Sequence, residues 1–242
     1  MHSVWLGEYL GTLVLLYLGG GVNAGVTLRK SYAADAGWLV VATGWGLAVL
    51  CGVLVAQAFG SSGAHLNPAI TLAAAVNSGD FSQLPCFWSA QMLGAIVGAV
   101  LVWLHFLPHW RETEDPGAKL ACFSTMPAIR NFGTNLLSEM IGTFVLLLGV
   151  AVIFSKKVAI GGPAGGLGPY LVGVLVWAIG LSLGGTTGYA INPARDLGPR
   201  IVHSLLPLGR KTGSGWSYAA VPVIGPLMGA GLAGLFVRLA HL

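Results

Sequence analysis

Charge is what this sequence lacks most. Lys, Arg, Asp and Glu make up only 8% of its 242 residues, whereas 55% of the residues are hydrophobic. The mean hydropathy is +0.78. Soluble domains typically carry about 25% charged residues. Most of the surface must therefore face lipid, and we interpret the chain as an all-α integral membrane protein.

Cysteine and clustered metal ligands are also scarce. Cys51, Cys86 and Cys122 show no C-x-x-C spacing, so the sequence gives neither a disulfide framework nor a thiolate metal site. His105 and His109 are separated by a proline and have no third ligand nearby. No nucleophile, base and orienting group can be assembled from the polar residues present. We therefore expect no metal, no cofactor and no enzyme chemistry.

A continuous basic run is missing as well. The net charge is +4, but the lysines and arginines are scattered through short loops. Isolated basic residues suit a lipid headgroup surface better than a nucleic acid. We expect membrane lipid around the protein and no nucleic-acid partner.

Long hydrophobic runs are abundant. A membrane-spanning helix needs about 20 apolar residues, and six runs have this length. They do not show the alternation of lipid-facing and inward residues that is typical of transmembrane strands. The predicted spans are residues 4–26, 38–59, 84–107, 132–154, 168–187 and 218–240.

The chain also repeats itself. "GEYLGTLVLLYLGGGV" is similar to "SEMIGTFVLLLGVAV", so that Glu8 corresponds to Glu139, 131 positions later. An odd number of spans in each copy places the two copies in opposite orientations. We predict one domain made of inverted repeats 1–108 and 130–242, joined by a loop at 109–129.

Each copy contains a similar polar segment, "GAHLNPAITL" in the first and "GYAINPARDL" in the second. Proline suits the first helical position and asparagine suits the N-cap, so Asn67-Pro68 and Asn192-Pro193 predict helix starts. The stretches that follow are too short to cross the membrane, and we expect two re-entrant half-helices. Irregular backbone at membrane depth is tolerated where it lines a watery cavity or is buried in protein, so the glycine-rich leads indicate a pore.

The two Asn-Pro-Ala motifs, the repeat and the paired glutamates resemble the aquaporin, or major intrinsic protein, family along essentially the whole chain. Asp196, Arg200 and the Pro222-Val223 pair are similar to the glycerol-conducting branch, as is "CFSTMP" before residue 132. The resemblance implies a passive channel for glycerol, similar small neutral solutes such as dihydroxyacetone, urea or lactic acid, and water. Protons and ions would be excluded. The alternative is a coupled secondary transporter, which would also use broken helices.

The resemblance also implies the site. The two motifs would meet at mid-membrane, backbone carbonyls of the leads would form an acceptor wall, and four residues would form a selectivity filter. The motif residues are Asn67, Pro68, Ala69, Asn192, Pro193 and Ala194. The carbonyl residues are Gly63, Ala64, His65, Leu66, Gly188, Tyr189, Ala190 and Ile191. The filter residues are Trp45, Gly180, Tyr189 and Arg195.

Three of the filter positions carry specific expectations. Gly180 would leave room for a three-carbon solute, and Tyr189 stands where bacterial glycerol facilitators usually have Phe. In glycerol facilitators a filter Trp usually lies about twenty residues before the Asn of the first motif, and the same count from Asn67 gives Leu47 in place of Trp45. We favour Trp45, because the sequence around it resembles the family and the lead before Asn67 can accommodate two inserted residues. About 200° of helix rotation separates the two positions, so only one faces the pore.

Three acids are interpreted as structural: Glu8, Glu139 and Asp196. We expect the two glutamates to accept backbone N–H bonds from the irregular leads, with a proton relay as the alternative. Asp196 would favour its helix start electrostatically, although it is also a candidate partner for Arg195.

Assembly and orientation come from the resemblance alone. It implies a homotetramer in the plasma membrane with both termini in the cytoplasm. Most of the basic residues would then lie outside, which contradicts the positive-inside rule. Gly94, Gly98, Gly225 and Gly229 allow close helix packing, either between protomers or within one.

Overall fold

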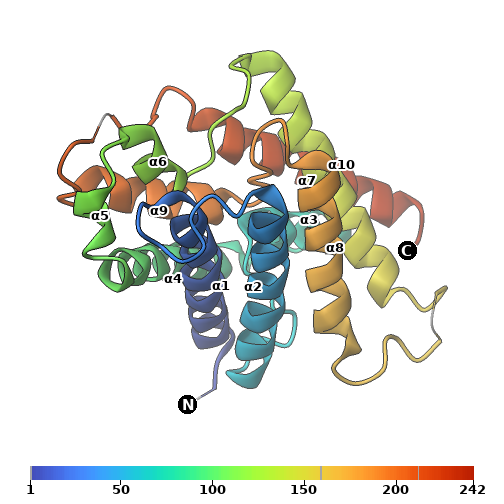
Figure 1. Ribbon diagram of the computed structural model, residues 1–242. Coiled ribbons are helices and arrows are strands. Elements are labelled where there is room, and N and C mark those ends of the chain that lie inside the picture. The colour runs from blue at the N-terminus through green and yellow to red at the C-terminus, as the bar shows by residue number, and fades with distance from the viewer. Residues whose placement is uncertain (1, 159, 212) are drawn as a thin grey trace.

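The computed structural model describes residues 2–158, 160–211 and 213–242, in which all regular secondary structure is helical (Figure 1). Six long helices are joined by two half-length helices and two short ones. The long helices are α1 (Val4–Thr27), α2 (Trp38–Ala58), α4 (Leu84–His105), α7 (Phe132–Phe154), α8 (Leu167–Leu183) and α10 (Ala220–Leu239). The others are α3 (Pro68–Ser78), α5 (His109–Glu112), α6 (Pro116–Ala121) and α9 (Pro193–Leu205).

The long helices agree with the predicted spans, except at the end of α8. Five of them are long and apolar enough to cross a membrane, and α8 has 17 residues, close to the lower limit of about 17–25. Helix α8 ends four residues earlier than the prediction of 168–187, at Leu183. A Cβ on the next residue, Gly184, would lie 2.6 Å from both Trp38 Cζ2 and Tyr189 Cδ1. The glycine therefore lets two aromatic rings pack where the helix stops.

The predicted loop 109–129 contains both short helices. Asp115 is the N-cap of α6 and accepts a hydrogen bond from the backbone N–H of Gly117, with Pro116 in the first helical turn. This Asp-Pro start is the same local chemistry that predicts α3 and α9.

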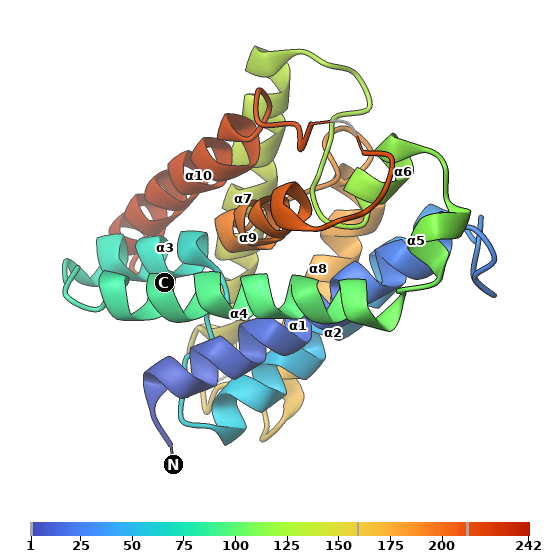
Figure 2. The same ribbon diagram turned by 90° about the vertical axis from the view of Figure 1, so that its left-hand side faces the viewer.

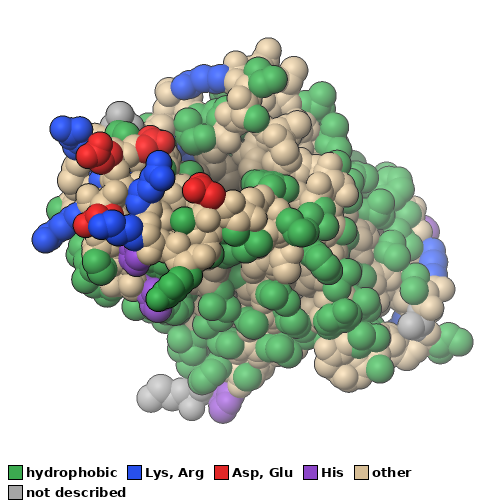
Figure 3. Space-filling model, viewed as in Figure 1, with side chains coloured by type: hydrophobic (Ala, Val, Ile, Leu, Met, Phe, Trp, Pro, Cys, Tyr) green, Lys and Arg blue, Asp and Glu red, His purple; other side chains and the backbone are tan. Residues whose placement is uncertain are grey.

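The surface of the long helices is hydrophobic, unlike that of a soluble protein. Large hydrophobic side chains on the long helices point outward, and examples are Leu47 on α2 and Leu137 on α7. Glu8 and Glu139 are 0% and 1% exposed. Figure 3 shows hydrophobic side chains over much of one face, with charged ones gathered near α5 and α6. An apolar exterior that also covers buried acidic groups is suited to lipid.

The helices pack in two matching sets. Helix α1 packs against α2 and α4, and α7 packs against α8 and α10. Each half-helix also contacts a long helix from the other part of the chain, α3 on α10 and α9 on α4. Both chain ends lie on the side opposite α5 and α6 (Figure 2). The exchange of half-helices ties the two parts of the chain into one body.

Four glycines bring these helices close together inside the protomer. A Cβ on Gly98 of α4 would lie 2.6 Å from Leu13 O of α1, and one on Gly225 of α10 would lie 2.7 Å from Glu139 Cβ of α7. Gly94 and Gly229 lie in the same two interfaces. Their tight packing therefore serves the protomer and gives no argument for a tetramer.

A matched pair of substitutions on α10 tests this packing. A Cβ on Gly229 would collide with the carbonyl oxygen of Met140, whereas one on Gly231 meets nothing within 4 Å. We expect Gly229→Ala to destabilise the protein by about 1–3 kcal/mol through overpacking. Gly231→Ala should be neutral or stabilising by up to about 1 kcal/mol through helix propensity. Thermal unfolding in detergent measures both, and an equal melting temperature for the two variants would contradict the packing argument.

Candidate functional site

Three cavities lie in series through the protein. The central cavity has a volume of about 60 Å³. One wider cavity of about 330 Å³ reaches Ala121 of α6, and we call it the α6 mouth. The other, of about 340 Å³, reaches Phe154, and we call it the Phe154 mouth. The central cavity shares Tyr189 with the first mouth and His65 with the second, so the three form a path with a narrow waist.

The two half-helices begin at this waist. Asn67 Oδ1 accepts from Ala69 N at 2.8 Å, and Asn192 Oδ1 accepts from Ala194 N at 3.0 Å, so both asparagines cap their helices as their sequence predicts. Pro68 and Pro193 occupy the first helical positions.

The same asparagines join the two parts of the chain. Asn67 Nδ2 donates to Ile191 O at 2.8 Å, and Asn192 Nδ2 donates to Leu66 O at 2.9 Å. An amide NH2 group has two hydrogens. Each asparagine therefore fixes the opposite lead with one hydrogen and retains a second hydrogen at the central cavity, which both residues line.

The backbone leading into each half-helix is irregular. Ala64, Leu66, Tyr189 and Ile191 have φ between +37° and +53°, a region that non-glycine residues rarely adopt. Six of the eight predicted carbonyl residues line the central cavity: Ala64, His65, Leu66, Tyr189, Ala190 and Ile191. Gly63 lines the Phe154 mouth and Gly188 lines the α6 mouth.

Glu8 holds the first lead in place. Its Oε1 accepts from Ser61 Oγ at 2.6 Å and His65 N at 2.8 Å. Its Oε2 accepts from Leu66 N and Gln91 Nε2, both at 2.8 Å. Four donors thus surround one buried carboxylate.

Glu139 does the same for the second lead. It accepts from Thr187 Oγ1 at 2.7 Å, Ala190 N at 2.9 Å and Ile191 N at 2.8 Å. Because each buried glutamate accepts from several donors at once, including two backbone N–H groups, it anchors its lead at more than one point. Neither glutamate lines any of the three cavities.

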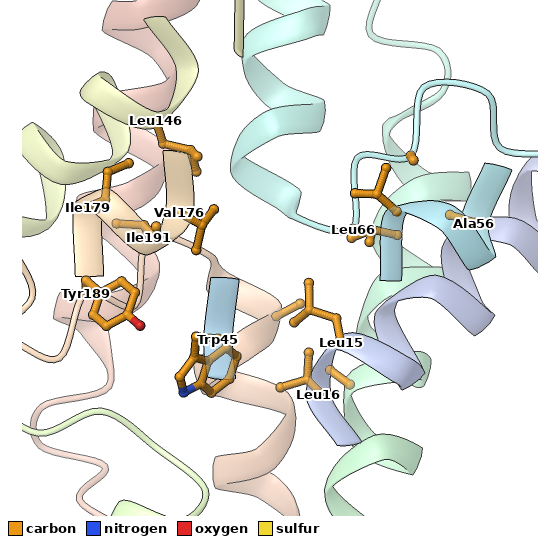
Figure 4. Close-up of a cluster of buried hydrophobic side chains, with 14 residues drawn as sticks. Leu15, Leu16, Trp45, Ala56, Leu66, Leu146, Val176, Ile179, Tyr189 and Ile191 are labelled. Carbon is orange, nitrogen blue, oxygen red and sulfur yellow. The ribbon is translucent and has the colours of Figure 1, made fainter. Parts of the chain in front are cut away.

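The filter candidates meet where the central cavity joins the α6 mouth. Trp45, Tyr189 and Arg195 line both cavities. The guanidinium carbon of Arg195 lies 4.1 Å from the centroid of the Trp45 ring. Figure 4 shows the Tyr189 hydroxyl pointing toward the side on which Trp45 lies. Leu47 is 55% exposed and lies in an outward groove between α2 and α8, so Trp45 is the residue that reaches the path.

Gly180 adjoins this group in an unexpected way. A Cβ at this position would lie 2.8 Å from both Cζ and Oη of Tyr189. The space beside Gly180 is therefore filled by the tyrosine ring, and the room expected there for a solute is not left open. Trp38 completes this corner, since its Nε1 donates to Gly180 O at 2.9 Å and its ring packs edge-on to Tyr189.

Asp196 pairs with Arg200 and not with Arg195. Its carboxylate accepts from Arg200 Nε at 2.7 Å and Nη2 at 2.9 Å, and from Thr125 N and Oγ1. Arg200 also donates to the carbonyl oxygens of Thr125, Ser214 and Gly215. Among the described residues, the Arg195 guanidinium forms no hydrogen bond, and it lines the path.

Sequence reasoning missed several residues that hold the site together. Ser61 and Thr187 bind the two glutamates, and their signal is available in the sequence, because each precedes its motif within six residues in a glycine-rich lead. Gln91 and Asn23 give no such signal, since their partners are distant in the sequence. From the sequence, Arg200 is identified only as a residue typical of the glycerol-conducting branch of the family, and nothing there indicates its complete burial.

Comparisons with known proteins agree with this geometry. The model of the family described as "Major intrinsic protein" matches residues 2–237, and the chain belongs to that family. A "Probable glycerol uptake facilitator protein" of Thermotoga maritima is 55% identical, with 94% of each chain covered. A "Glycerol uptake facilitator protein" of Bacillus subtilis is 53% identical over 99% of this chain and 85% of its own length.

A solved structure has the same fold. The X-ray structure of the aquaglyceroporin from Plasmodium falciparum superposes with a TM-score of 0.83 and 29% identity, covering 97% of this chain and 94% of that one. The predicted all-α fold with two half-helices is therefore the aquaporin fold, and the protein is an integral membrane protein.

The carboxylate anchors generate a stability prediction. In Glu8→Gln an NH2 group replaces one oxygen and faces donors, so up to two of the four hydrogen bonds are lost. We expect a loss of roughly 2–5 kcal/mol, because buried donors are left unsatisfied. Glu114→Gln, at an exposed position, is the control and should be neutral. Thermal unfolding in detergent measures the difference, and an unchanged midpoint for Glu8→Gln would contradict the anchoring role.

Proposed function

We propose that the protein is a passive channel for glycerol, similar small neutral solutes and water. The observation that carries this proposal is the narrow central cavity between two capped half-helices. Arg195 lies at one end of this cavity together with the aromatic residues Trp45 and Tyr189. The names of the bacterial relatives support glycerol as the solute class.

The lining of the central cavity suits an amphipathic solute. It includes the leads, with Asn67, Asn192 and Arg195 as hydrogen-bond donors, and apolar side chains such as Leu15 and Val176. A polyol can direct its hydroxyl groups to the polar groups and its carbon-bound hydrogens to the apolar side chains, so that desolvation is partly compensated.

Positive potential at the waist opposes cations. The N-termini of α3 and α9 both lie there, and a helix N-terminus carries roughly half a positive charge. Arg195 adds a full positive charge, and its guanidinium forms no salt bridge or hydrogen bond among the described residues. In the proposed channel, ions and protons are excluded by this field and by the loss of hydration in a narrow passage.

The coupled transporter is the weaker alternative. Coupling needs an ion-binding or titratable group on the solute path. Glu8 and Glu139 lie off the three described cavities, with their oxygens occupied by donors from the leads. These contacts favour anchoring over a proton relay.

We also propose features that the sequence resemblance implies. The chain is one channel domain of inverted repeats 1–108 and 130–242. It assembles as a homotetramer in the plasma membrane, with both termini in the cytoplasm. The arrangement of both chain ends on the side opposite α5 and α6 is compatible with this orientation. Cross-linking in membranes and one-sided labelling of single cysteines are the measurements that check assembly and orientation.

Flux in proteoliposomes tests the function. Stopped-flow experiments should show glycerol entry that depends on the glycerol gradient alone, with no proton flux coupled to it. Empty liposomes are the control. Saturable uptake that collapses when a proton or sodium gradient is dissipated would instead support the transporter. Water, dihydroxyacetone, urea and lactic acid, compared in the same assay, define the solute range.

A pair of alanine variants on α2 tests the filter. Trp45 is 4% exposed and lies on the path, whereas Leu47 faces outward. We expect Trp45→Ala to widen the passage and admit longer polyols such as xylitol, because removal of an indole leaves a large space. Leu47→Ala, matched for expression, should keep the size limit of the parent. The reverse result would place the filter wall at Leu47.

A further inference from the structure

A buried polar side chain on α1 contacts the proposed filter residue Trp45. Asn23 is 8% exposed and lines the α6 mouth. Its Oδ1 accepts from Trp45 Nε1 at 3.0 Å. Its Nδ2 donates to the carbonyl oxygen of Ala121, the last residue of α6, at 3.2 Å. One amide therefore connects the indole to a different segment of the chain.

The chemistry of the partners fixes the orientation of this amide. An indole N–H can only donate, and a backbone carbonyl can only accept. The amide oxygen of Asn23 must face Trp45, and its NH2 group must face Ala121. A flipped amide would place donor against donor and acceptor against acceptor. The contact thus holds Trp45 in one arrangement.

A second residue of α1 holds the other end of the ring. A Cβ on Gly19 would lie 2.7 Å from Trp45 Cη2, so the six-membered ring occupies the space that this glycine leaves. Gly19 and Asn23 are four residues apart, on one face of α1. The glycine seats the benzene edge and the asparagine binds the N–H, which together fix the plane of the indole against which Arg195 lies.

We propose that Asn23 is a positioning residue that sets the orientation of the Trp45 wall and keeps the indole N–H away from the solute. This inference rests on the proposed function, since it assumes that Trp45 is part of the filter. With its N–H bound to Asn23, the indole presents an apolar surface without a free donor. The alkyl side of a polyol then slides along Trp45, and its hydroxyl groups are directed to Arg195 and the backbone.

Loss of Asn23 would change selectivity more than stability. In Asn23→Leu the side chain has similar volume but binds neither partner, so the indole N–H must seek water or a solute hydroxyl. We expect the ratio of glycerol to water permeability to fall by about threefold or more, the scale of one net hydrogen bond. Asn135→Leu is the matched control, because Asn135 is a buried asparagine whose Nδ2 also donates to a carbonyl, that of Ile129, away from the three cavities. It should leave the ratio unchanged.

A double-mutant cycle separates positioning from a general structural effect. Phenylalanine has no N–H, so Asn23→Leu should have no further effect on the ratio in a Trp45→Phe background. An equal fall in both backgrounds, or an unchanged ratio in Asn23→Leu alone, overturns the inference. If Asn23→Leu does not fold, Asn23→Ala enters the same cycle.

The outcomes also distinguish this inference from the filter proposal. If neither Trp45→Ala nor Trp45→Phe alters the size limit or the permeability ratio, the filter proposal itself fails. If the Trp45 variants alter them and Asn23→Leu does not, only the positioning role of Asn23 fails.

Discussion

Unpaired backbone amides inside a membrane are the constraint on which the structure depends. The backbone of the leads at 61–67 and 187–192 is irregular, and lipid offers no hydrogen bonds, so its N–H groups need partners within the protein. Glu8 and Glu139 each accept from two of these N–H groups. Because the glutamates bind N–H groups of the leads, carbonyl groups of the same backbone are available to a solute. The acceptor wall of the proposed channel follows from where the two carboxylates sit.

Hydrogen bonds between the two leads fix the positions of the half-helices. Asn67 and Asn192 each cap one half-helix and bind the carbonyl of the other lead. A displacement of one half-helix would break a helix cap or a hydrogen bond between the leads, so the two helix ends are held at a fixed separation. A waist only about 60 Å³ in volume needs such fixation, since small shifts would close it or admit ions.

Local chemistry made much of this predictable from the sequence. Asn-Pro predicts both half-helix starts, and hydrophobic runs predict five of the long helices within a few residues. The end of α8 was misplaced although a local signal is present, because Gly184 and Gly185 follow the last helical residue and glycine favours helix ends. The filled space beside Gly180 and the contact between Asn23 and Trp45 are different. Each depends on side chains that meet only after helices from different parts of the chain have packed, and no local pattern marks them.

Helix α9 carries two arginines with different roles, Arg200 within the protein and Arg195 on the proposed path. Arg200 is fully buried and bound to Asp196 and to three backbone carbonyls, so its charge is neutralised and its donors are occupied. Arg195, five residues earlier, contacts the face of Trp45 and has no anionic partner among the described residues. Arg195 and Asp196 are adjacent in the helix, and adjacent helical side chains point in different directions. The carboxylate therefore binds Arg200 one turn later, while the guanidinium of Arg195 lines the path with its donors unoccupied by any residue that the structure describes.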